Sequence, residues 1–320
     1  MLLPRYLISL VAINTFILVT GVASGQDYPS KPIRIVTVEP GGSSDFVARL
    51  LAHGLSANLG QAVIVENRPN VVVPGEVVAK ATPDGYTLLL GGQAHWLLPF
   101  LRDRLPWDPM KDFLPVSLTS SQPNILVVHP SLPVKSVKDV IDLAKSRPGQ
   151  LNYATPGTGA SGHIAGELFN AMAAVNIVNV RYKGNGPALN GLIGNEVQLS
   201  FPSAGAATPH IKSGRLRALA MTSVQPSALL PGLPSVSSTL PGYEAVSLQG
   251  MFVPAKTPTA IITRLNQEVV RVLNKTEVKE RFLNAGIEPV GNSAAAFAEQ
   301  LKSDMARLGK LIRDVGMKAE

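Results

Sequence analysis

The chain alternates between short runs with strand-like patterns and longer stretches with helix-like patterns. Residues 33–38 predict a strand, and the apolar positions of residues 45–59 recur every three or four residues, which predicts a helix. The other predicted strands cover 62–66, 86–90, 125–128, 151–154, 178–182, 197–201 and 216–222, and the other predicted helices cover 135–145, 161–173, 187–193, 257–273 and 294–315. Strands that alternate with helices are typical of an α/β fold with largely parallel sheets.

Two strand–helix units of domain size follow each other along the chain and meet near Val128. The chain is expected to return from the second unit to the first near residues 250–253, ahead of the last two predicted helices. The predicted lobes are therefore residues 26–128 together with 252–320, and residues 129–251.

The first 25 residues have the pattern of a secretory signal peptide. Arg5 precedes a largely apolar stretch, and the small residues Ala23 and Gly25 stand at the −3 and −1 positions before Gln26. An uncleaved membrane anchor is the alternative, but polar residues interrupt the apolar stretch and no stop-transfer charges follow it. We therefore expect cleavage after Gly25 and export of the mature chain to the periplasm.

Composition disfavours several classes of protein. The chain has no cysteine, which excludes disulfides, thiolate chemistry, cysteine-bound metals and a lipidated N-terminus. Its net charge is +7, but Lys and Arg are dispersed singly and aromatic residues make up only 5%, so a nucleic-acid surface is not expected. The five histidines are too widely spaced to predict a metal site. We therefore expect neither a cofactor nor a metal.

Two loops rich in glycine and serine, residues 40–45 and 155–163, each stand between a predicted strand and a predicted helix. The first N–H groups of a helix have no internal partner and carry the positive end of its dipole, so such a terminus binds anions. The alternative is that both loops are ordinary capped turns, in which Asp45 and Ser161 serve only their helices. Because the two loops occupy equivalent positions in the two units, we favour an anion site between them.

The second loop also matches two enzyme patterns in part. Residues 157–162 fit the dinucleotide fingerprint Gly-x-Gly-x-x-Gly, but Tyr182 stands where an acidic residue should hold the ribose. Ser161 lies close to His163 in sequence, but no acidic partner is evident and no Gly-x-Ser-x-Gly motif occurs. We therefore do not expect an enzyme, and His163 either packs locally or contacts a ligand.

Several stretches, in a consistent order and spacing, resemble the tripartite tricarboxylate transporter receptor family, also called the Bug family of solute-binding proteins. The resemblance extends from about Tyr28 to the C-terminus. The matching stretches are PGGSSDFVAR at 40–49, VENRP at 65–69, PDGYTLL at 83–89, LPWDP at 105–109, LNY at 151–153 leading into Gly159 and His163, YKG at 182–184 with Pro187-Ala188, and LRALA at 216–220.

The resemblance implies a type II periplasmic-binding-protein fold, in which two lobes close on a ligand cleft. It also implies that the ligand is a small carboxylate held by backbone groups, hydroxyls and waters. The receptor is expected to be a monomer that delivers this ligand to the subunits of a membrane permease. By position, the implied ligand-binding residues are Gly41, Gly42, Ser43, Ser44 and Asp45 in one lobe and Thr158, Gly159, Ala160, Ser161 and His163 in the other.

The sequence also departs from the family pattern at the predicted pocket. Val38 replaces an aromatic residue, Glu39 a proline and Pro202 a frequent aspartate, and residues 70–75 replace a glycine-rich run. These changes predict a more aliphatic pocket and leave the ligand's identity open. A periplasmic sensor that signals to a membrane kinase is the alternative to a transport receptor, because both functions require the same closure around a ligand.

Overall fold

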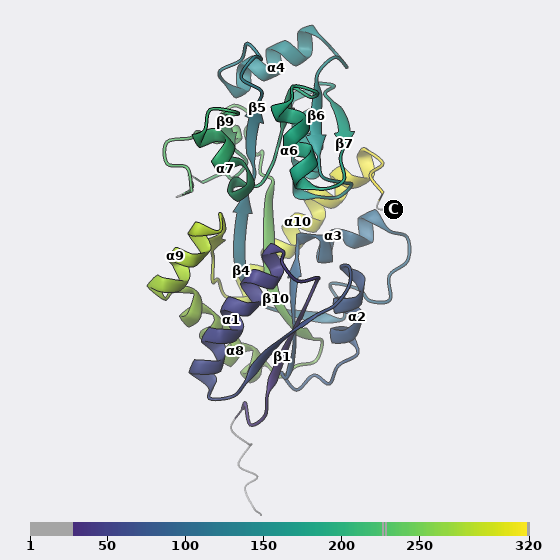
Figure 1. The fold of residues 1–320 in the computed structure, drawn as a ribbon. Helices are drawn as coiled ribbons and strands as arrows, with labels where there is room; N and C mark the ends of the chain where they lie inside the picture. Colours follow the sequence, from purple (N-terminus) through teal and green to yellow (C-terminus); the bar gives the residue numbers. More distant parts are fainter. Residues whose placement is uncertain (1–27, 226, 228, 319–320) are drawn as a thin grey trace, which may run out of the picture.

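The computed structural model describes residues 28–225, 227 and 229–318, so the predicted signal peptide lies outside the described residues. The described chain forms two lobes, one above the other, joined by long crossing strands (Figure 1). Each lobe is built around its own β-sheet and has helices on both faces of that sheet.

The first lobe contains a six-stranded sheet in the order β11-β4-β10-β3-β1-β2. Its strands are β1 (Ile33–Thr37), β2 (Val63–Asn67), β3 (Thr87–Gly92), β4 (Phe113–Pro123), β10 (Val246–Pro254) and β11 (Glu288–Pro289). Strand β1 is parallel to β2 and β3, whereas β10 is antiparallel to β3 and β4. The antiparallel part of this sheet therefore contains the two strands that lead to the other lobe.

Helices cover both faces of this first sheet. One face carries α1 (Ser43–Leu59), α8 (Thr259–Leu273) and α9 (Thr276–Asn284), and the other carries α2 (Val72–Ala79), α3 (Gln93–Leu101) and α10 (Ala294–Asp314). Successive strand residues point to opposite faces. Accordingly, Ile35 packs in the cluster that contains Leu51 of α1, and Val36 packs in the cluster that contains Trp96 of α3. Burial on both faces explains the nearly continuous apolar runs of the central strands.

The second lobe contains a five-stranded sheet in the order β7-β6-β8-β5-β9. Its strands are β5 (Ile125–Val128), β6 (Asn152–Thr155), β7 (Val178–Arg181), β8 (Leu199–Ser200) and β9 (Arg217–Met221), and its helices are α4 (Val137–Ser146), α5 (Ser161–Ala173), α6 (Asn185–Ile193) and α7 (Ala204–Lys212), with a short 3-10 turn at Val236–Ser238. Leu126 packs with α4 and α5, and Val127 with α6 and α7.

Both sheets are mixed, which corrects the prediction of largely parallel sheets. The parallel pairs are those within the strand–helix–strand units, β1 with β2 and β3 and β6 with β7 and β8. The long antiparallel strands β4 and β10 were not predicted at all. In β4, the polar residues Ser117, Thr119 and Ser120 are buried, so the strand lacks the apolar pattern by which a buried strand is normally found.

The chain also changes lobes at other residues than predicted. Strand β4 ends at Pro123 and β5 begins at Ile125 in the second sheet, so the first crossing is at Asn124 and not near Val128. The return crossing precedes Val246, because all of β10 belongs to the first sheet, and not near 250–253. At the first crossing, extended chain runs from one sheet into the other without a turn, so no turn residues mark it in the sequence; the return crossing follows a turn at residues 240–243.

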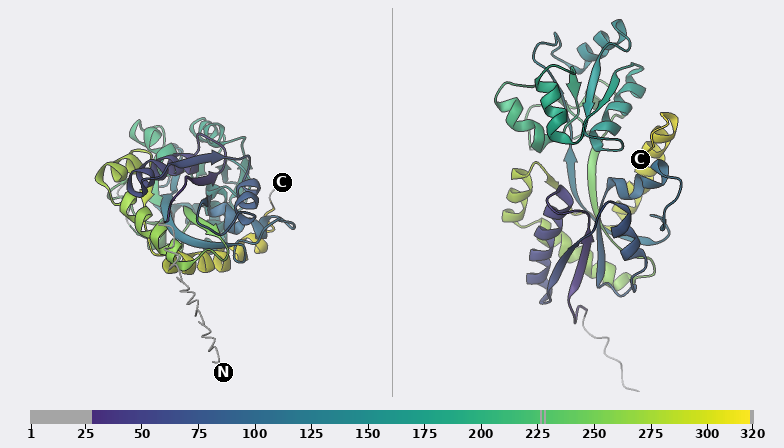
Figure 2. Two further views of the ribbon diagram at one scale, coloured as in Figure 1. Left: turned by 90° about the horizontal axis from the view of Figure 1, so that it is seen from below. Right: turned by 45° about the vertical axis from the view of Figure 1, so that its right-hand side comes forward.

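Further contacts join the lobes beside the crossings. Helix α10 extends from the first lobe alongside the second (Figure 2), and its Arg307 Nη1 donates to the backbone carbonyl of Glu244 over 2.5 Å. At another point the backbones of Gly205 and Gly286 approach so closely that a Cβ added to Gly286 would lie 2.4 Å from the Gly205 Cα. Within the described parts of the chain, no helix is long and apolar enough to span a bilayer.

Candidate functional site

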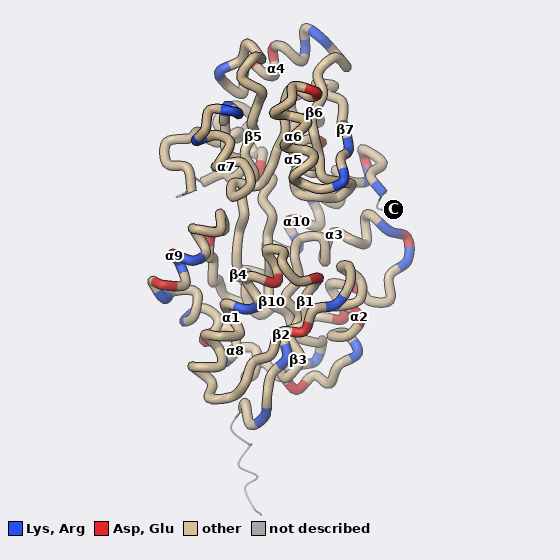
Figure 3. The backbone as a smooth tube through the Cα atoms, in the orientation of Figure 1, with Lys and Arg blue, Asp and Glu red and all other residues tan. Residues whose placement is uncertain are grey.

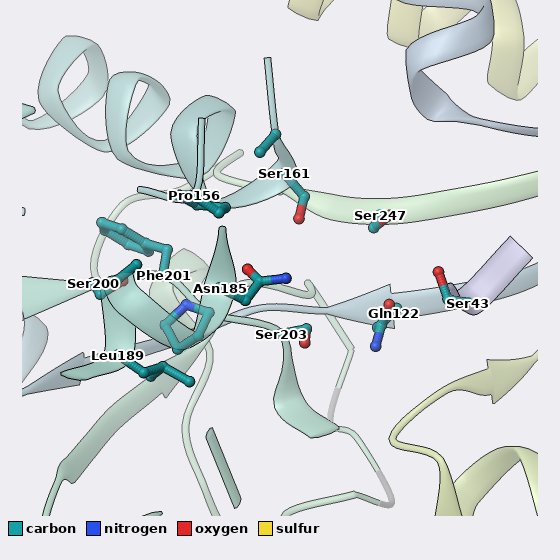
Figure 4. Close-up of a pocket in the computed structure, with 14 residues that line it drawn as sticks. Ser43, Gln122, Pro156, Ser161, Asn185, Leu189, Ser200, Phe201, Ser203 and Ser247 are labelled. Carbon is teal, nitrogen blue, oxygen red and sulfur yellow. The ribbon is translucent and has the colours of Figure 1, made fainter. Parts of the chain in front are cut away.

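A cavity of about 190 Å³ lies where the two lobes meet the crossing strands. Ser43 and Gln122 lie on one side of it, and Ser161, Asn185 and Ser203 lie on the other (Figure 4). The lining residues are Ser43, Gln122, Pro156, Ala160, Ser161, Gly162, Asn185, Ala188, Leu189, Ser200, Phe201, Pro202, Ser203 and Ser247. No Lys, Arg, His, Asp or Glu is among them, so the walls of the cavity carry hydroxyl, amide and apolar groups only.

Four helices begin at this cavity. Ser43, Ser161 and Asn185 are the first residues of α1, α5 and α6, and Ser203 is the N-cap of α7. At none of these four termini does the N-cap side chain hydrogen-bond to its own helix. The first-turn N–H groups of a helix lack partners within the helix and carry partial positive charge. The cavity is therefore electropositive although no cation lines it.

The second-lobe side of the cavity is partly apolar. Ala188 and Leu189 of α6, together with Phe201 and Pro202 after β8, form this part of the wall. The floor is formed by Gln122 of β4 and Ser247 of β10, which are paired neighbours on the two crossing strands. A ligand in the cavity would thus meet helix N-termini, hydroxyl groups and an aliphatic wall.

The first predicted loop is held in shape by the carboxylate of Asp45. Asp45 accepts hydrogen bonds from the Gly41 backbone N–H at 3.1 Å, from Arg49 Nε at 3.1 Å and from Asn67 Nδ2 at 2.9 Å. Burial by itself raises the pKa of Asp45, but these hydrogen bonds and the charge of Arg49 outweigh it and lower the pKa. Gly41 has φ +87°, a conformation that favours glycine. Asp45 therefore stabilises the conformation of the loop in which Ser43 lines the cavity.

The second predicted loop is held by His163. The buried His163 accepts a hydrogen bond at Nδ1 from the backbone N–H of Gly159 over 3.1 Å, and its Nε2 lies 3.8 Å from Glu167 Oε1. Burial lowers the pKa of His163, with a smaller lowering by Arg181 and an opposing effect of Glu167. The neutral imidazole is the form that can accept the Gly159 hydrogen bond. His163 therefore plays the same part in this loop as Asp45 plays in the first.

The predicted site residues thus separate into three groups. Ser43, Ala160 and Ser161 line the central cavity. Thr158 and His163 instead line a second cavity of about 360 Å³, beside Arg181 and the end of α10. Gly41 and Asp45 hold the first loop, Gly159 packs near Leu101 of the other lobe, and Gly42 and Ser44 flank Ser43 without lining the cavity. Ligand contact by any of these ten residues stays a prediction.

Most of the cavity wall was not predicted from the sequence. Pro202 was itself marked as a departure from the family pattern at the predicted pocket, and Asn185 directly follows the matching stretch YKG. Gln122 and Ser247 had no such signal, because the strands that carry them were not predicted. In the described residues, no group of three or more His, Asp or Glu side chains is arranged to hold a metal ion.

Figure 3 shows Lys and Arg dispersed over both lobes without a continuous basic stripe. Two cations near the loops in sequence, Arg49 and Lys183, do not reach the cavity. Arg49 pairs with Asp45 at 2.9 Å and also donates to Asn67, while Lys183 is exposed and lies outside the lining. Any anion in the cavity would therefore be held by helix N-termini and neutral side chains.

Comparisons with known proteins identify the family of this chain. A family model described as "Tripartite tricarboxylate transporter family receptor" matches residues 47–317. The protein BugT of Bordetella pertussis is 34% identical over 318 residues, which cover 97% of this chain and 98% of BugT.

Two solved structures extend the comparison to the fold. R. palustris Rpa4515 with adipate is 34% identical, with a TM-score of 0.75, and the match covers 91% of this chain and 99% of that protein. MatC from Rhodopseudomonas palustris with bound malate is 27% identical, with a TM-score of 0.71, over 89% of this chain and all of MatC (100%). This chain therefore belongs to the tripartite tricarboxylate transporter receptor family.

Proposed function

We propose that this protein is a periplasmic solute receptor that captures a small carboxylate between its lobes and delivers it to a membrane transporter of the tripartite tricarboxylate type. The observation that carries the proposal is the convergence of four helix N-termini on a cavity with no charged side chain in its walls. Such an arrangement binds an anion through backbone N–H groups and hydroxyls. It also releases the anion readily, because no buried ion pair has to be broken.

The cavity supports a narrower ligand class than carboxylates in general. A ligand ammonium group would find no carboxylate among the lining residues, and burying an unpaired charge is costly. The apolar wall of Ala188, Leu189 and Pro202 suits a hydrocarbon segment. We therefore propose a carboxylate with an apolar body and no amino group. Adipate, present in the related Rpa4515 structure, has these properties.

A calorimetric titration with four acids tests the ligand class. Adipate and malate are the ligands of two related structures, benzoate offers one carboxylate on an aromatic body, and aspartate adds an ammonium group to a malate-like skeleton. We expect binding of at least one of the first three and none of aspartate. Removing one donor, by Ser43→Ala or Ser161→Ala, should cost about 1 kcal/mol of binding, because the other donors remain. Failure of the first three acids to bind would contradict the proposed function, and binding of aspartate would contradict the proposed ligand class.

Closure of the lobes is a second expectation of the same function. The chain crosses between the lobes at Asn124 and again before Val246, which gives two strands about which the lobes can rotate. Small-angle scattering with a saturating acid should therefore give a smaller radius of gyration than scattering without it. An unchanged radius at saturation would contradict capture by closure.

An uptake assay tests delivery to the transporter. Cells that lack this chain but retain the permease should lose uptake of the bound acid.

A further inference from the structure

Two buried side-chain amides lie behind the cavity, one directly after the crossing strand β4 and one within the crossing strand β10. Asn124 is the residue between β4 and β5, and Gln249 lies on β10; they are 0% and 3% exposed. Within the described residues, Nδ2 of Asn124 and Oε1 of Gln249 have no hydrogen-bond partner. Buried polar atoms seldom stay unpaired in folded proteins, so these two atoms require an explanation.

Each amide contacts the first residue of a helix that begins at the cavity. Gln249 Nε2 donates to Ser43 Oγ of α1 over 2.8 Å. On the other side, Ser161 Oγ of α5 donates to Asn124 Oδ1 over 3.3 Å. Ser43 and Ser161 line the cavity, whereas neither amide does. Both amides therefore lie in a layer behind the serines.

The two contacts have opposite directions. A serine hydroxyl has one proton to donate, and its oxygen can accept at the same time. Ser43 accepts from Gln249, so its proton is available to a ligand in the cavity. Ser161 has given its proton to Asn124, so it cannot donate to a ligand in this arrangement. The Ser43 hydroxyl is therefore prepared to donate to a ligand, and the Ser161 hydroxyl is not.

The backbones of both amides are fixed, so a change of direction has to come from the side chains. The backbone N–H of Asn124 donates to Thr222 Oγ1 over 2.8 Å, and the Thr222 hydroxyl donates back to the Asn124 carbonyl over 3.0 Å. The backbone carbonyl of Gln249 accepts from Thr119 Oγ1 over 2.9 Å. The oxygen and nitrogen of an amide have nearly the same shape, so a rotation of the Asn124 side chain exchanges them within the same space.

We propose that Asn124 and Gln249 are positioning residues that direct the protons of Ser161 and Ser43, and that a bound carboxylate turns the Asn124 amide. This inference rests on the proposed function. When the carboxylate enters, Ser161 donates to it, and Asn124 Nδ2 donates to Ser161 Oγ. The nitrogen then gains a partner and the oxygen loses the Ser161 proton, so the Asn124–Ser161 pair becomes equivalent to the Gln249–Ser43 pair, in which the amide oxygen is the unpartnered atom.

Adipate titrations of matched variants test this inference. Asn124→Asp keeps the shape of the side chain, and its ionised form can only accept. At a pH above the pKa of the introduced carboxyl it retains the Ser161 proton and should weaken adipate binding about tenfold, as for a lost charge-assisted hydrogen bond. The added negative charge alone would also weaken binding, and a double variant separates the two causes. If Asn124 acts through Ser161, Asn124→Asp combined with Ser161→Ala should bind no more than about twofold more weakly than Asn124→Asp alone.

Gln249→Glu and Ser43→Ala form the same cycle on the first-lobe side of the cavity and should be coupled in the same way. Asn58→Asp is the matched control, because the Asn58 Nδ2 is also buried without a partner but lies near the far end of α1 from Ser43; this variant should bind adipate like the wild type. If the losses of Asn124→Asp and Ser161→Ala multiply, the inference is overturned while the proposed function stands. If the wild type itself binds none of the acids, the proposed function fails and the inference with it.

Discussion

The two loops at the cavity perform the same task with different chemistry. In the first lobe the ionised Asp45 receives hydrogen bonds from Gly41, Arg49 and Asn67. In the second lobe the neutral His163 receives one hydrogen bond, from Gly159. Both arrangements fix a glycine with positive φ, +87° at Gly41 and +76° at Gly159, and both leave a serine at the start of the following helix facing the cavity.

The difference indicates that the first loop is held more firmly than the second. Hydrogen bonds to a charged group are about twice as strong as those between neutral groups, and Asp45 has three donor partners. The single acceptor nitrogen of His163 is lost on protonation, because imidazolium only donates. The second loop is thus the weaker half of the site, and it belongs to the lobe in which Ser161 still has to turn toward a ligand.

Loss of Asp45 should have the largest effect on stability. Asp45→Ala leaves the Gly41 N–H and the Asn67 amide without their partner, and we expect a loss of about 3 kcal/mol in the free energy of unfolding. Urea denaturation measures this loss. Asp142→Ala is the control, because Asp142 forms an exposed ion pair with Lys138 and should cost less than about 1 kcal/mol. Equal losses in the two variants would contradict the structural role of Asp45.

Low pH should destabilise the second loop but not the first, and a larger pH effect from His95 in the core has to be removed before this difference can be measured. Burial lowers the pKa of His95 to about 3, and the ring stacks on Trp107 with both nitrogens unpartnered in the described residues. His95 therefore binds a proton near pH 6.5 in the unfolded chain but stays neutral in the folded chain, and the free energy of unfolding falls as the pH drops below 6.5. Between pH 7 and 5, the wild type should lose about 2 kcal/mol more than His95→Phe.

Denaturation of His95→Phe at both pH values then exposes the contribution of His163. The pKa of His163 is also lowered in the folded chain, so the contribution of His163 to stability is lost as the pH falls below the pKa of histidine in the unfolded chain. The pKa of Asp45 is lowered too, so Asp45 stays ionised and the first loop stays intact between pH 7 and 5. If the wild type and His95→Phe respond equally to acid, the assignment of the core effect to His95 is wrong.

Removal of His163 should have the smallest and most local effect. His163→Ala deletes one hydrogen bond between neutral groups, and we expect a loss of about 1 kcal/mol in the free energy of unfolding. Hydrogen exchange of the Gly159 amide should become faster, and that of the Gly41 amide should not change. His53→Ala, at an exposed position on α1, is the control and should alter neither amide. Faster exchange at Gly41 in His163→Ala would show that the two loops do not act separately.

Regular segments of the chain were predicted well because their side chains have a single environment. The predicted helix 161–173 agrees with α5, and the predicted strand 125–128 agrees with β5. Helices α2, α3, α7 and α9 were missed, and two of them contain an internal proline, Pro99 in α3 and Pro209 in α7, which normally argues against a helix. The crossing strands were missed because their buried residues include serine, threonine and glutamine.

The sequence by itself determined the α/β fold class, the two glycine- and serine-rich loops and the resemblance to a receptor family, because these depend on local patterns of residue types. The tertiary structure alone decided which loop residues reach the cavity. The starts of α6 and α7 also reach the central cavity, whereas Thr158 and His163 line another cavity. Asn124 and Gln249 lie behind Ser161 and Ser43. These placements depend on how two sheets are joined by extended strands, and contacts between residues up to 206 positions apart, as for Gln249 and Ser43, leave no local trace in the sequence.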